Sequence, residues 1–241
     1  MRPESFKNKL LQNLDEEIIR RLDLHPVRLE QGREIEAPGK HIEGLYFIET
    51  GIGSMTTTFQ DGSQVEVGMF GYESVMGAPA LMGNRRSLNN VIMQMGGHGF
   101  CTGLDLAERE FMRGEKFHDL VLRYVQVLLV HTAQSAGCNA KHRLKQRLSR
   151  WLLVCQDRAE SDVLYLTQEF LADMLGTRRA TVSVAAEMLR RRKLIDYRRG
   201  VVRILNRAGL EQTACECYRV VKEYLDSYTD VDQDGKNLQA E

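Results

Sequence analysis

The chain has 241 residues, of which 43% are hydrophobic and 27% are charged, and its formal net charge is zero. This length allows one large domain or two modest domains that each bury a core. No apolar run reaches the roughly 18 residues of a membrane span, and the first ten residues lack the apolar core of a signal peptide. We therefore expect a cytoplasmic protein with no membrane partner.

The zero net charge conceals an uneven distribution. Residues 139–207 contain 16 Lys and Arg against 7 Asp and Glu, a net charge of +9, whereas residues 1–138 carry −4 and residues 208–241 carry −5. A polyanion is attracted to the middle segment and weakly repelled by the rest. The distribution favours a nucleic-acid partner for residues 139–207.

Within the first hundred residues, the predicted secondary structure changes from helix to short strands near residue 27. Residues 1–26 are predicted to hold one amphipathic helix over Leu10–Leu24, because leucine and isoleucine recur there at helical spacing. Fourteen of the 20 glycines then lie within 27–103 and separate short β-prone runs such as 44–48. Many short strands with frequent turns indicate an antiparallel β-sandwich or roll.

Residues 105–138 are predicted to be helical. Their inward stripe consists of Phe117, Val121, Tyr124, Leu128, His131 and Ser135, widened by Val125 and Leu129. A long apolar helix between two domains commonly pairs with a twin; the alternative is that the stripe packs on the β domain. Asn139 is predicted to cap a further helix that ends at Gln156.

Residues 168–185 follow the spacing of a helix-turn-helix. Glycine at the turn tolerates positive φ, a small residue allows the helices to cross closely, and apolar residues face the shared core; these positions are Gly176, Ala172, Leu171, Leu175, Val182 and Ala185. Thr167 and Thr177 are predicted N-caps of the two helices. The second helix would begin with Arg178 and Arg179, which suit phosphates and guanine edges. A plain helical hairpin is the alternative.

The remaining segments complete a winged arrangement. Two β-prone runs, 194–197 and 201–205, flank Arg198-Arg199-Gly200 and predict a hairpin wing. A final helix is expected over 210–228, and the polar tail 229–241 is predicted to be disordered.

This order of parts resembles the cyclic-AMP receptor protein/Fnr (Crp/Fnr) family of bacterial transcription regulators over about residues 15–228. The most specific stretch runs from LTQEFLADMLGTRRATV to LRRRKLIDYRRGVVRIL, within 166–205. The resemblance implies an α+β fold: an N-terminal antiparallel β-roll sensor domain (27–104), a long dimerisation helix (105–138) and a C-terminal winged helix-turn-helix domain (139–228).

The resemblance also implies a function. The chain would be a sequence-specific, effector-responsive homodimer that reads a palindromic DNA site in the major groove, with RNA polymerase as a further partner. The β-roll would pass its signal through the long helix. We expect no enzyme, since the chain has neither a GKS/T phosphate loop nor a GxSxG elbow. A cyclic-nucleotide sensor and a non-specific DNA-binding protein are the alternatives.

The candidate DNA contacts follow from alignment with the family motif. Arg179 takes the place of an arginine that contacts guanine, with a phosphate contact as the alternative. Ala180 and Val184 replace an acidic residue and a second arginine, so the base preference should differ. The predicted DNA-binding residues are Thr167, Gln168, Thr177, Arg178, Arg179, Thr181, Ser183, Arg198, Arg199 and Arg203.

Effector and metal sites are less well supported by the sequence. Gly77, Arg86 and Ser87 could stand in the family's phosphate-binding turn, but Ala78 replaces its glutamate; the alternative for Arg86 is a solvated loop charge. No cofactor is predicted and the effector is not specified. The cysteines are scattered, and Cys215 and Cys217, placed two apart on one helix, should point in different directions. We therefore expect no metal site.

Overall fold

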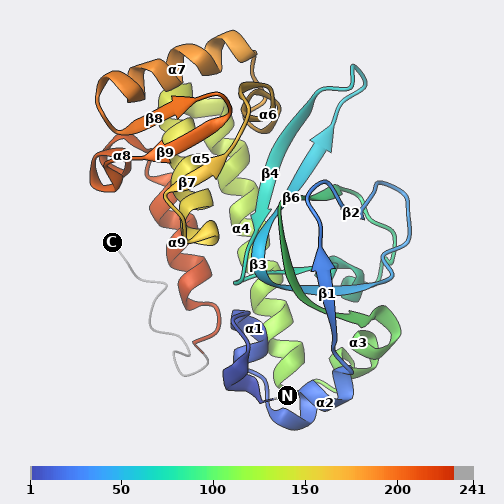
Figure 1. Cartoon of the computed structure of the whole chain (residues 1–241). Helices are drawn as coiled ribbons and strands as arrows, with labels where there is room; N and C mark the ends of the chain where they lie inside the picture. The colour runs from blue at the N-terminus through green and yellow to red at the C-terminus, as the bar shows by residue number, and fades with distance from the viewer. Residues whose placement is uncertain (1, 231–241) are drawn as a thin grey trace.

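The structure is a computed structural model that describes residues 2–230. It combines a curved antiparallel sheet, a long helix beside it and a helical domain with a small sheet of its own (Figure 1). The α+β architecture predicted from the sequence is confirmed. Residues 231–241 of the predicted disordered tail lie outside the described residues. Within residues 2–230, no helix has the length and apolar character needed to cross a membrane.

The amino-terminal half is the predicted antiparallel β-roll. Its sheet has the order β1-β6-β3-β4, with β2 paired to β6 and β5 paired to β3. The pairing of the two longest strands shifts register several times between Ile48 and Gly53, which bends the sheet into a roll. The strands are β1 (His25–Leu29), β2 (Glu34–Glu36), β3 (Gly44–Thr58), β4 (Gln64–Phe70), β5 (Val75–Met76) and β6 (Asn90–Gly103).

Short helices close one end of the roll, and here the prediction of a single helix over Leu10–Leu24 is wrong. The segment forms α1 (Lys9–Gln12) and α2 (Glu16–Leu22), preceded by a 3-10 turn, η1 (Pro3–Ser5). The break falls at Asp15, whose backbone is extended at the N-cap of α2. A second 3-10 turn, η2 (Ala78–Met82), follows β5.

The segment predicted as one helix over 105–138 is two helices. α3 (Leu104–Phe111) and α4 (Lys116–Lys141) are separated near Gly114, which has a φ of 68° that favours glycine. α4 also extends past Asn139, so Asn139 does not cap the next helix. That helix, α5 (Leu144–Ala159), begins after a two-residue connector, and the Gln146 side chain accepts a hydrogen bond from the Arg143 amide at its start.

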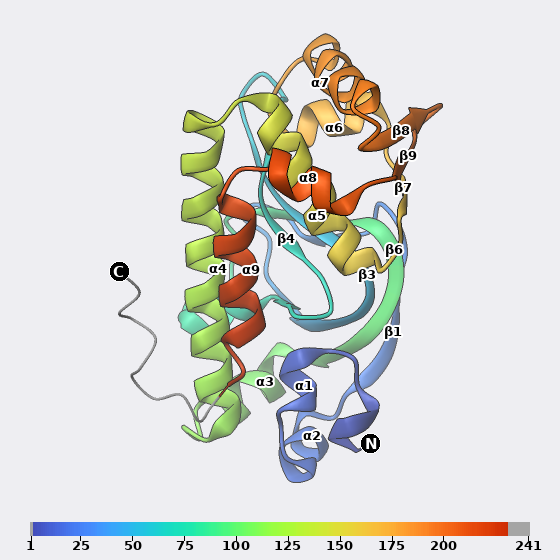
Figure 2. The same cartoon turned by 90° about the vertical axis from the view of Figure 1, so that its left-hand side faces the viewer.

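The predicted inward stripe of α4 packs within its own chain. Five of its members are buried: Phe117, Val121, Tyr124, His131 and Ser135. They lie against the roll and against α9 (Cys217–Ser227), which runs beside α4 (Figure 2). The alternative, that the stripe packs on the β domain, is the one the structure supports. Any contact with a twin helix must use another face of α4.

The carboxy-terminal domain contains α5, the helical hairpin α6 (Gln168–Met174) and α7 (Arg179–Arg191), and a three-stranded sheet of order β7-β9-β8. The strands are β7 (Val163–Tyr165), β8 (Ile195–Arg198) and β9 (Val201–Ile204). The expected final helix is divided into α8 (Arg207–Thr213) and α9, because the backbone at Ala214 is extended. This break positions the cysteines described below.

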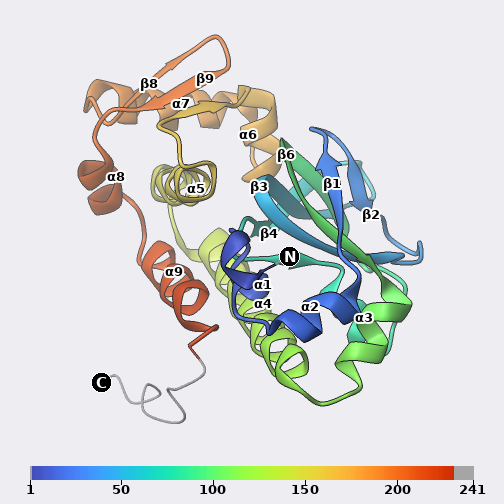
Figure 3. The same ribbon diagram turned by 60° about the horizontal axis from the view of Figure 1, so that its bottom comes forward.

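Helix α5 packs beside the roll (Figure 3). The contact between them is polar and buried. The Trp151 indole donates a 2.8 Å hydrogen bond to Glu66, and Arg158 forms a 2.7 Å ion pair with Glu73. The side chains of Arg158 and Glu73 are only 4% and 6% exposed. This interface fixes the placement of α5, and with it the helix-turn-helix, relative to the roll.

Candidate nucleic-acid interface

The helix-turn-helix hairpin is built as its spacing predicts. Thr167 caps α6 by accepting a 3.1 Å hydrogen bond from the Phe170 amide. Gly176 in the turn has a φ of 56°. The residues predicted to form the small core are all buried: Leu171, Ala172, Leu175, Val182 and Ala185. Because this core fixes α7 against α6, the opposite face of α7 is rigidly presented to solvent.

The N-terminus of α7 differs from the prediction. The helix begins at Arg179, and Arg178 occupies the N-cap position without a side-chain capping bond. Thr177 is not the N-cap, since its amide closes the end of α6 by donating to the carbonyl of Ala172 at 2.9 Å. The first two amides of α7 therefore remain available to an anion, in line with the positive end of the helix dipole.

The outward face of α7 holds most of the predicted readers. Arg178, Arg179 and Thr181 are exposed, as are the two residues that depart from the family pattern, Ala180 and Val184. Arg179 pairs with the Glu169 carboxylate at 2.7 Å, and both side chains are more than 60% exposed. An ion pair this open to water is weak, so a DNA phosphate or base can replace Glu169 at small cost.

Two predicted residues contact each other rather than solvent alone. The Ser183 hydroxyl donates a 2.7 Å hydrogen bond to the Gln168 side chain. Both residues are half-buried. Ser183 and Gln168 thus join α6 to α7, and either would have to exchange this bond to read a base.

The wing is a tight hairpin. Arg199 and Gly200 both have positive φ, 49° and 77°, the combination that suits a two-residue turn between twisted strands. Arg198, Arg199 and Arg203 are exposed, and Arg198 pairs with Asp196 at 3.2 Å. The wing therefore carries three exposed cations, and their contact with phosphates stays a prediction.

A groove beside α7 adds two cations, Arg143 and Lys145, that the sequence analysis did not name. It has a volume of about 670 Å³ and lies between the start of α5, α7 and α8. Its lining includes Arg143, Lys145, Thr181, Val184, Met188 and Arg192. The sequence signal that could have found them is the basic run Lys141, Arg143 and Lys145 shortly before the hairpin. In the structure Arg143 and Lys145 stand at the N-terminus of α5, where the helix dipole adds to their positive potential.

The basic end of α7 is partly neutralised within the helix. Arg190 and Arg191 donate to Glu187 at 2.7 and 2.9 Å, and these bonds lower the pKa of Glu187 to about 2. The two arginines are therefore engaged locally, whereas Arg192 faces the groove.

The turn of the hairpin rests on the roll. A Cβ added to Gly176 would lie 2.4 Å from Val65 Cγ2 on β4. A groove of about 630 Å³ runs along this contact, lined by residues 59–65 around the tip of the β3–β4 hairpin and by Thr177, Arg178 and Thr181. The β3–β4 hairpin thus lies beside the N-terminus of α7.

The three residues predicted for an effector lie close together around an internal carboxylate. Glu36 is buried, accepts hydrogen bonds from the Gly77 amide (2.9 Å) and the Ser87 hydroxyl (2.7 Å), and burial raises its pKa. Arg86 is exposed and donates to the carbonyl of Gly39. Two of the three donors, Gly77 and Ser87, therefore already hold Glu36, and this buried carboxylate does not favour an anionic nucleotide there.

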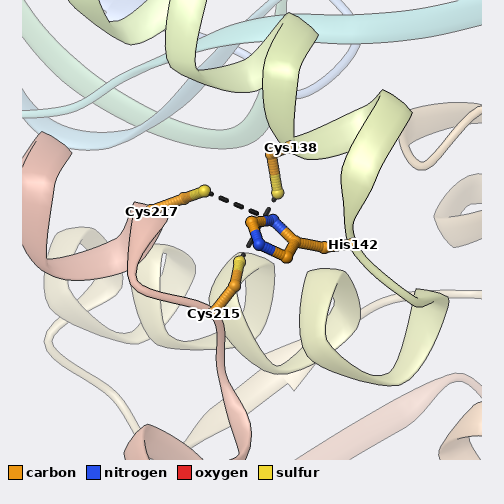
Figure 4. A group of neighbouring side chains, drawn as sticks. All are labelled: Cys138, His142, Cys215 and Cys217. Carbon is orange, nitrogen blue, oxygen red and sulfur yellow. Dashed lines mark hydrogen bonds between the residues drawn. The ribbon is translucent and has the colours of Figure 1, made fainter.

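The cysteines contradict the prediction that Cys215 and Cys217 point apart. Helix α9 begins only at Cys217, so Cys215 lies in the connector after α8 and helical geometry does not separate the two. Their sulfurs meet Cys138 and His142 from α4 and its C-cap, and all four ligand atoms lie within 4.8 Å of one another (Figure 4). The expectation of no metal site depended on the wrong helix boundary.

Comparisons with known proteins agree with this geometry. Residues 146–213 match the family described as the Crp-like helix-turn-helix domain. The global nitrogen regulator of Synechococcus elongatus is 22% identical over 215 residues, 86% of this chain and 97% of that protein.

Solved structures share the fold at low identity. A crp/fnr-family transcriptional regulator from Eubacterium rectale has a TM-score of 0.65 at 15% identity, covering 85% of this chain and 96% of its own. FixK2 from Bradyrhizobium japonicum has a TM-score of 0.69 at 16% identity, covering 80% and 98%. Residues 146–213 therefore belong to the Crp-like helix-turn-helix domain family, a DNA-binding domain, and the nitrogen regulator and the solved structures resemble the whole chain in sequence and fold.

Proposed function

We propose that this regulator is a homodimer that reads a specific, palindromic DNA site by inserting α7 into the major groove. The observation that supports this most is the rigid, exposed face at the start of α7, which carries Arg178 and Arg179 over a fully buried hairpin core. A helix held this way can present its N-terminal side chains to base edges. Its amides and the nearby cations provide the phosphate contacts that set register.

Arg179 is the proposed principal reader. Its guanidinium pairs with the exposed Glu169 carboxylate, which a guanine edge can replace with a bidentate contact. Thr181 and Arg178 flank it on the exposed face as partial readers. Ala180 and Val184 are exposed and apolar, which suits contact with thymine methyl groups. The DNA sequence that this protein prefers should therefore differ from the sequences bound by Crp/Fnr proteins with charged residues at these two positions.

The proposed backbone contacts surround this face. Arg198, Arg199 and Arg203 come from the wing, and Arg143 and Lys145 come from the groove at the start of α5. Each neutralised phosphate releases counterions, so affinity should fall steeply with salt. These residues contribute affinity and orientation rather than base preference.

The proposed dimer contact is a second face of α4. Six residues on this face are exposed at alternating intervals of four and three, as in the seam of a two-stranded coiled coil: Leu122, Gln126, Leu129, Ala133, Ala136 and Ala140. Leu122 and Leu129 are 42% and 68% exposed in the single chain, and a twin helix on this face would remove their apolar surface from water. A twin α4 is the occupant that heptad spacing selects, and the two α7 helices would then reach half-sites about one DNA turn apart.

The remaining partners follow from this role. A regulator that acts at promoters meets RNA polymerase there, and the chromosome lies in the bacterial cytoplasm, so we propose both that partner and that compartment. In vitro transcription from a selected site, with purified polymerase, tests the first. An effector acting on the roll would reach α7 through the α5 interface and the β3–β4 hairpin.

Selection from a random DNA library tests the central proposal. The full-length protein should enrich one palindrome with half-site centres about 10 base pairs apart. Enrichment without a common sequence would replace the proposal with non-specific DNA binding. Repeating the selection with cAMP and cGMP tests the sensor alternative, and we expect no change because Glu36 already engages Gly77 and Ser87.

A further inference from the structure

Four potential metal ligands meet where the long helix joins the DNA-binding domain. Cys138 lies in the last turn of α4, His142 in the connector to α5, Cys215 in the connector between α8 and α9, and Cys217 at the first position of α9 (Figure 4). The three cysteines are buried and form a cluster of their own. None of the four contributes to the DNA-facing surface described above.

The spacing of the ligand atoms matches a tetrahedral ion. The sulfurs of Cys138 and Cys215 are 3.5 Å apart, and Cys217 Sγ is 3.5 Å from His142 Nδ1. With zinc–sulfur bonds of ~2.3 Å and zinc–nitrogen bonds of ~2.0 Å, the ligand atoms of a tetrahedral site are separated by about 3.5–3.8 Å. These two separations already have the tetrahedral length, and the other four, none above 4.8 Å, would shorten by at most about 1 Å around one ion.

The neighbours of the ligands are those that such a site requires. His142 Nε2 lies 3.2 Å from the Glu216 carboxylate, so the ring can donate there and direct Nδ1 toward an ion. The Gln134 amide donates a 3.1 Å hydrogen bond to Cys217 Sγ. Cys217 also stands at the N-terminus of α9, where the helix dipole stabilises a thiolate.

The charge of the surroundings suits thiolates. A zinc ion with three thiolates and one neutral imidazole has a net charge of −1. Arg150 is buried nearby, and its Nε has no hydrogen-bond partner among the described residues. The pocket is therefore positive where the site would be negative.

We propose that Cys138, His142, Cys215 and Cys217 bind one Zn²⁺ ion in a closed tetrahedral site. Three thiolates and an imidazole are the ligands that zinc prefers, and four protein ligands leave no position for substrate, which makes the site structural. Binding displaces the thiol protons to solvent. The ion would join α9 to the connector between α4 and α5, and so fix where the DNA-binding domain leaves the long helix.

Metal analysis of the full-length protein, purified under reducing conditions from zinc-supplemented cells, tests the site directly. We expect about one zinc per chain. Replacement by Co²⁺ should give thiolate charge-transfer absorption and the visible bands of a tetrahedral ion. Zinc-free protein that gives no such absorption with Co²⁺ would overturn the proposal. So would a bound iron chromophore, or a Cys138–Cys215 disulfide in the freshly purified protein.

Variants assign the ligands. Cys215→Ser should lose the zinc, whereas Cys101→Ser, a half-buried cysteine on β6 outside the cluster, should keep it. Because loss of a buried ligand can unfold the chain, Glu216→Gln provides a second comparison at an exposed position. It should weaken zinc affinity about 10- to 100-fold. Glu223→Gln, exposed on the same helix, should leave the affinity unchanged, and equal affinities in both variants would contradict the assignment.

Hydrogen exchange tests, without DNA, whether the zinc ion joins α9 to the connector between α4 and α5. Chelation should accelerate hydrogen exchange in α9 and at the start of α5, and leave β3 and β6 unchanged. Uniform acceleration would point to global unfolding, and no acceleration would remove the proposed role. Loss of DNA specificity with zinc retained would contradict the proposed function alone, so the two proposals fail separately.

Discussion

Charged side chains serve two different purposes in this molecule. At the DNA-facing surface, Arg179 and Glu169 form a pair that is more than 60% exposed. At the α5 interface, Arg158 and Glu73 form a pair that is almost fully buried, with further bonds from Arg158 to the carbonyls of Met69 and Val154. Exposed pairs are weak and can be exchanged, whereas breaking a buried pair strands a charge. Arg179 can therefore exchange Glu169 for a DNA group at small cost, whereas Arg158 and Glu73 hold α5 against the roll.

The largest effect should come from breaking the buried pair. Arg158→Met leaves the Glu73 carboxylate buried without its partner and should lower the free energy of unfolding by about 3–5 kcal/mol. Urea denaturation of the full-length protein measures it. Adding Glu73→Gln should recover much of the loss, because the stranded charge is then removed. A single-variant loss below 1 kcal/mol would show that the pair does not hold the interface.

A second buried carboxylate should make stability depend on pH. Burial raises the pKa of Glu66 to about 7, partly offset by bonds from Ser54 and Trp151. The folded state therefore holds this proton more tightly than the unfolded state, and stability falls as pH rises from about 4.5 to about 7, by ~2–3 kcal/mol. Denaturation curves between pH 5 and 8 measure the slope. Glu66→Gln should remove this component, and an unchanged slope would assign it elsewhere.

At the exposed surface, Arg179→Ala should cost about 1–3 kcal/mol of binding to the selected DNA site and relax preference at one base position. Titrations against the site and its single-base variants measure both. Arg219→Ala, an exposed arginine on α9 paired with Glu223, is the matched control and should bind normally. Equal loss on every sequence would make Arg179 a phosphate contact.

The smallest effect is expected from the partner of Arg179. Glu169→Ala removes an exposed ion pair, so it should change the free energy of unfolding by less than ~1 kcal/mol. Affinity for DNA should rise slightly, since a negative charge beside the reader is lost. A large loss of stability would mean that the exposed pair resembles the buried one, which would break the distinction between the two regions.

Short-range patterns were the predictable part of this structure. The spacing of Leu171, Gly176 and Val182 defined the hairpin, and Arg199-Gly200 defined the wing turn, because each involves contacts within a few residues. The glycine rhythm of residues 27–103 was sufficient for an antiparallel roll, since strand and turn preferences are local.

The misses arise from helix boundaries and distant contacts. Breaks near Gly114 and Ala214 divided helices that periodicity alone had joined. Cys138 and Cys215 are 77 positions apart and meet only because α9 folds back along α4. Glu36 reaches Gly77 across 41 positions. No local sequence pattern encodes these long-range contacts. Neither the cysteine cluster nor the hydrogen bonds of Glu36 with Gly77 and Ser87 could therefore be predicted.

The seam of α4 tapers along its length. Its half beside the roll carries Leu122 and Leu129, and its half beside the DNA-binding domain carries Ala133, Ala136 and Ala140. In the proposed dimer, small side chains would bring the helices closest at the end that leads to the reading helices. The side-chain volume at Ala133, Ala136 and Ala140 would then determine the distance between the two α7 helices of the dimer. A single enlarged alanine, far from any base, could then change which genes the regulator controls by changing the operator spacing it accepts.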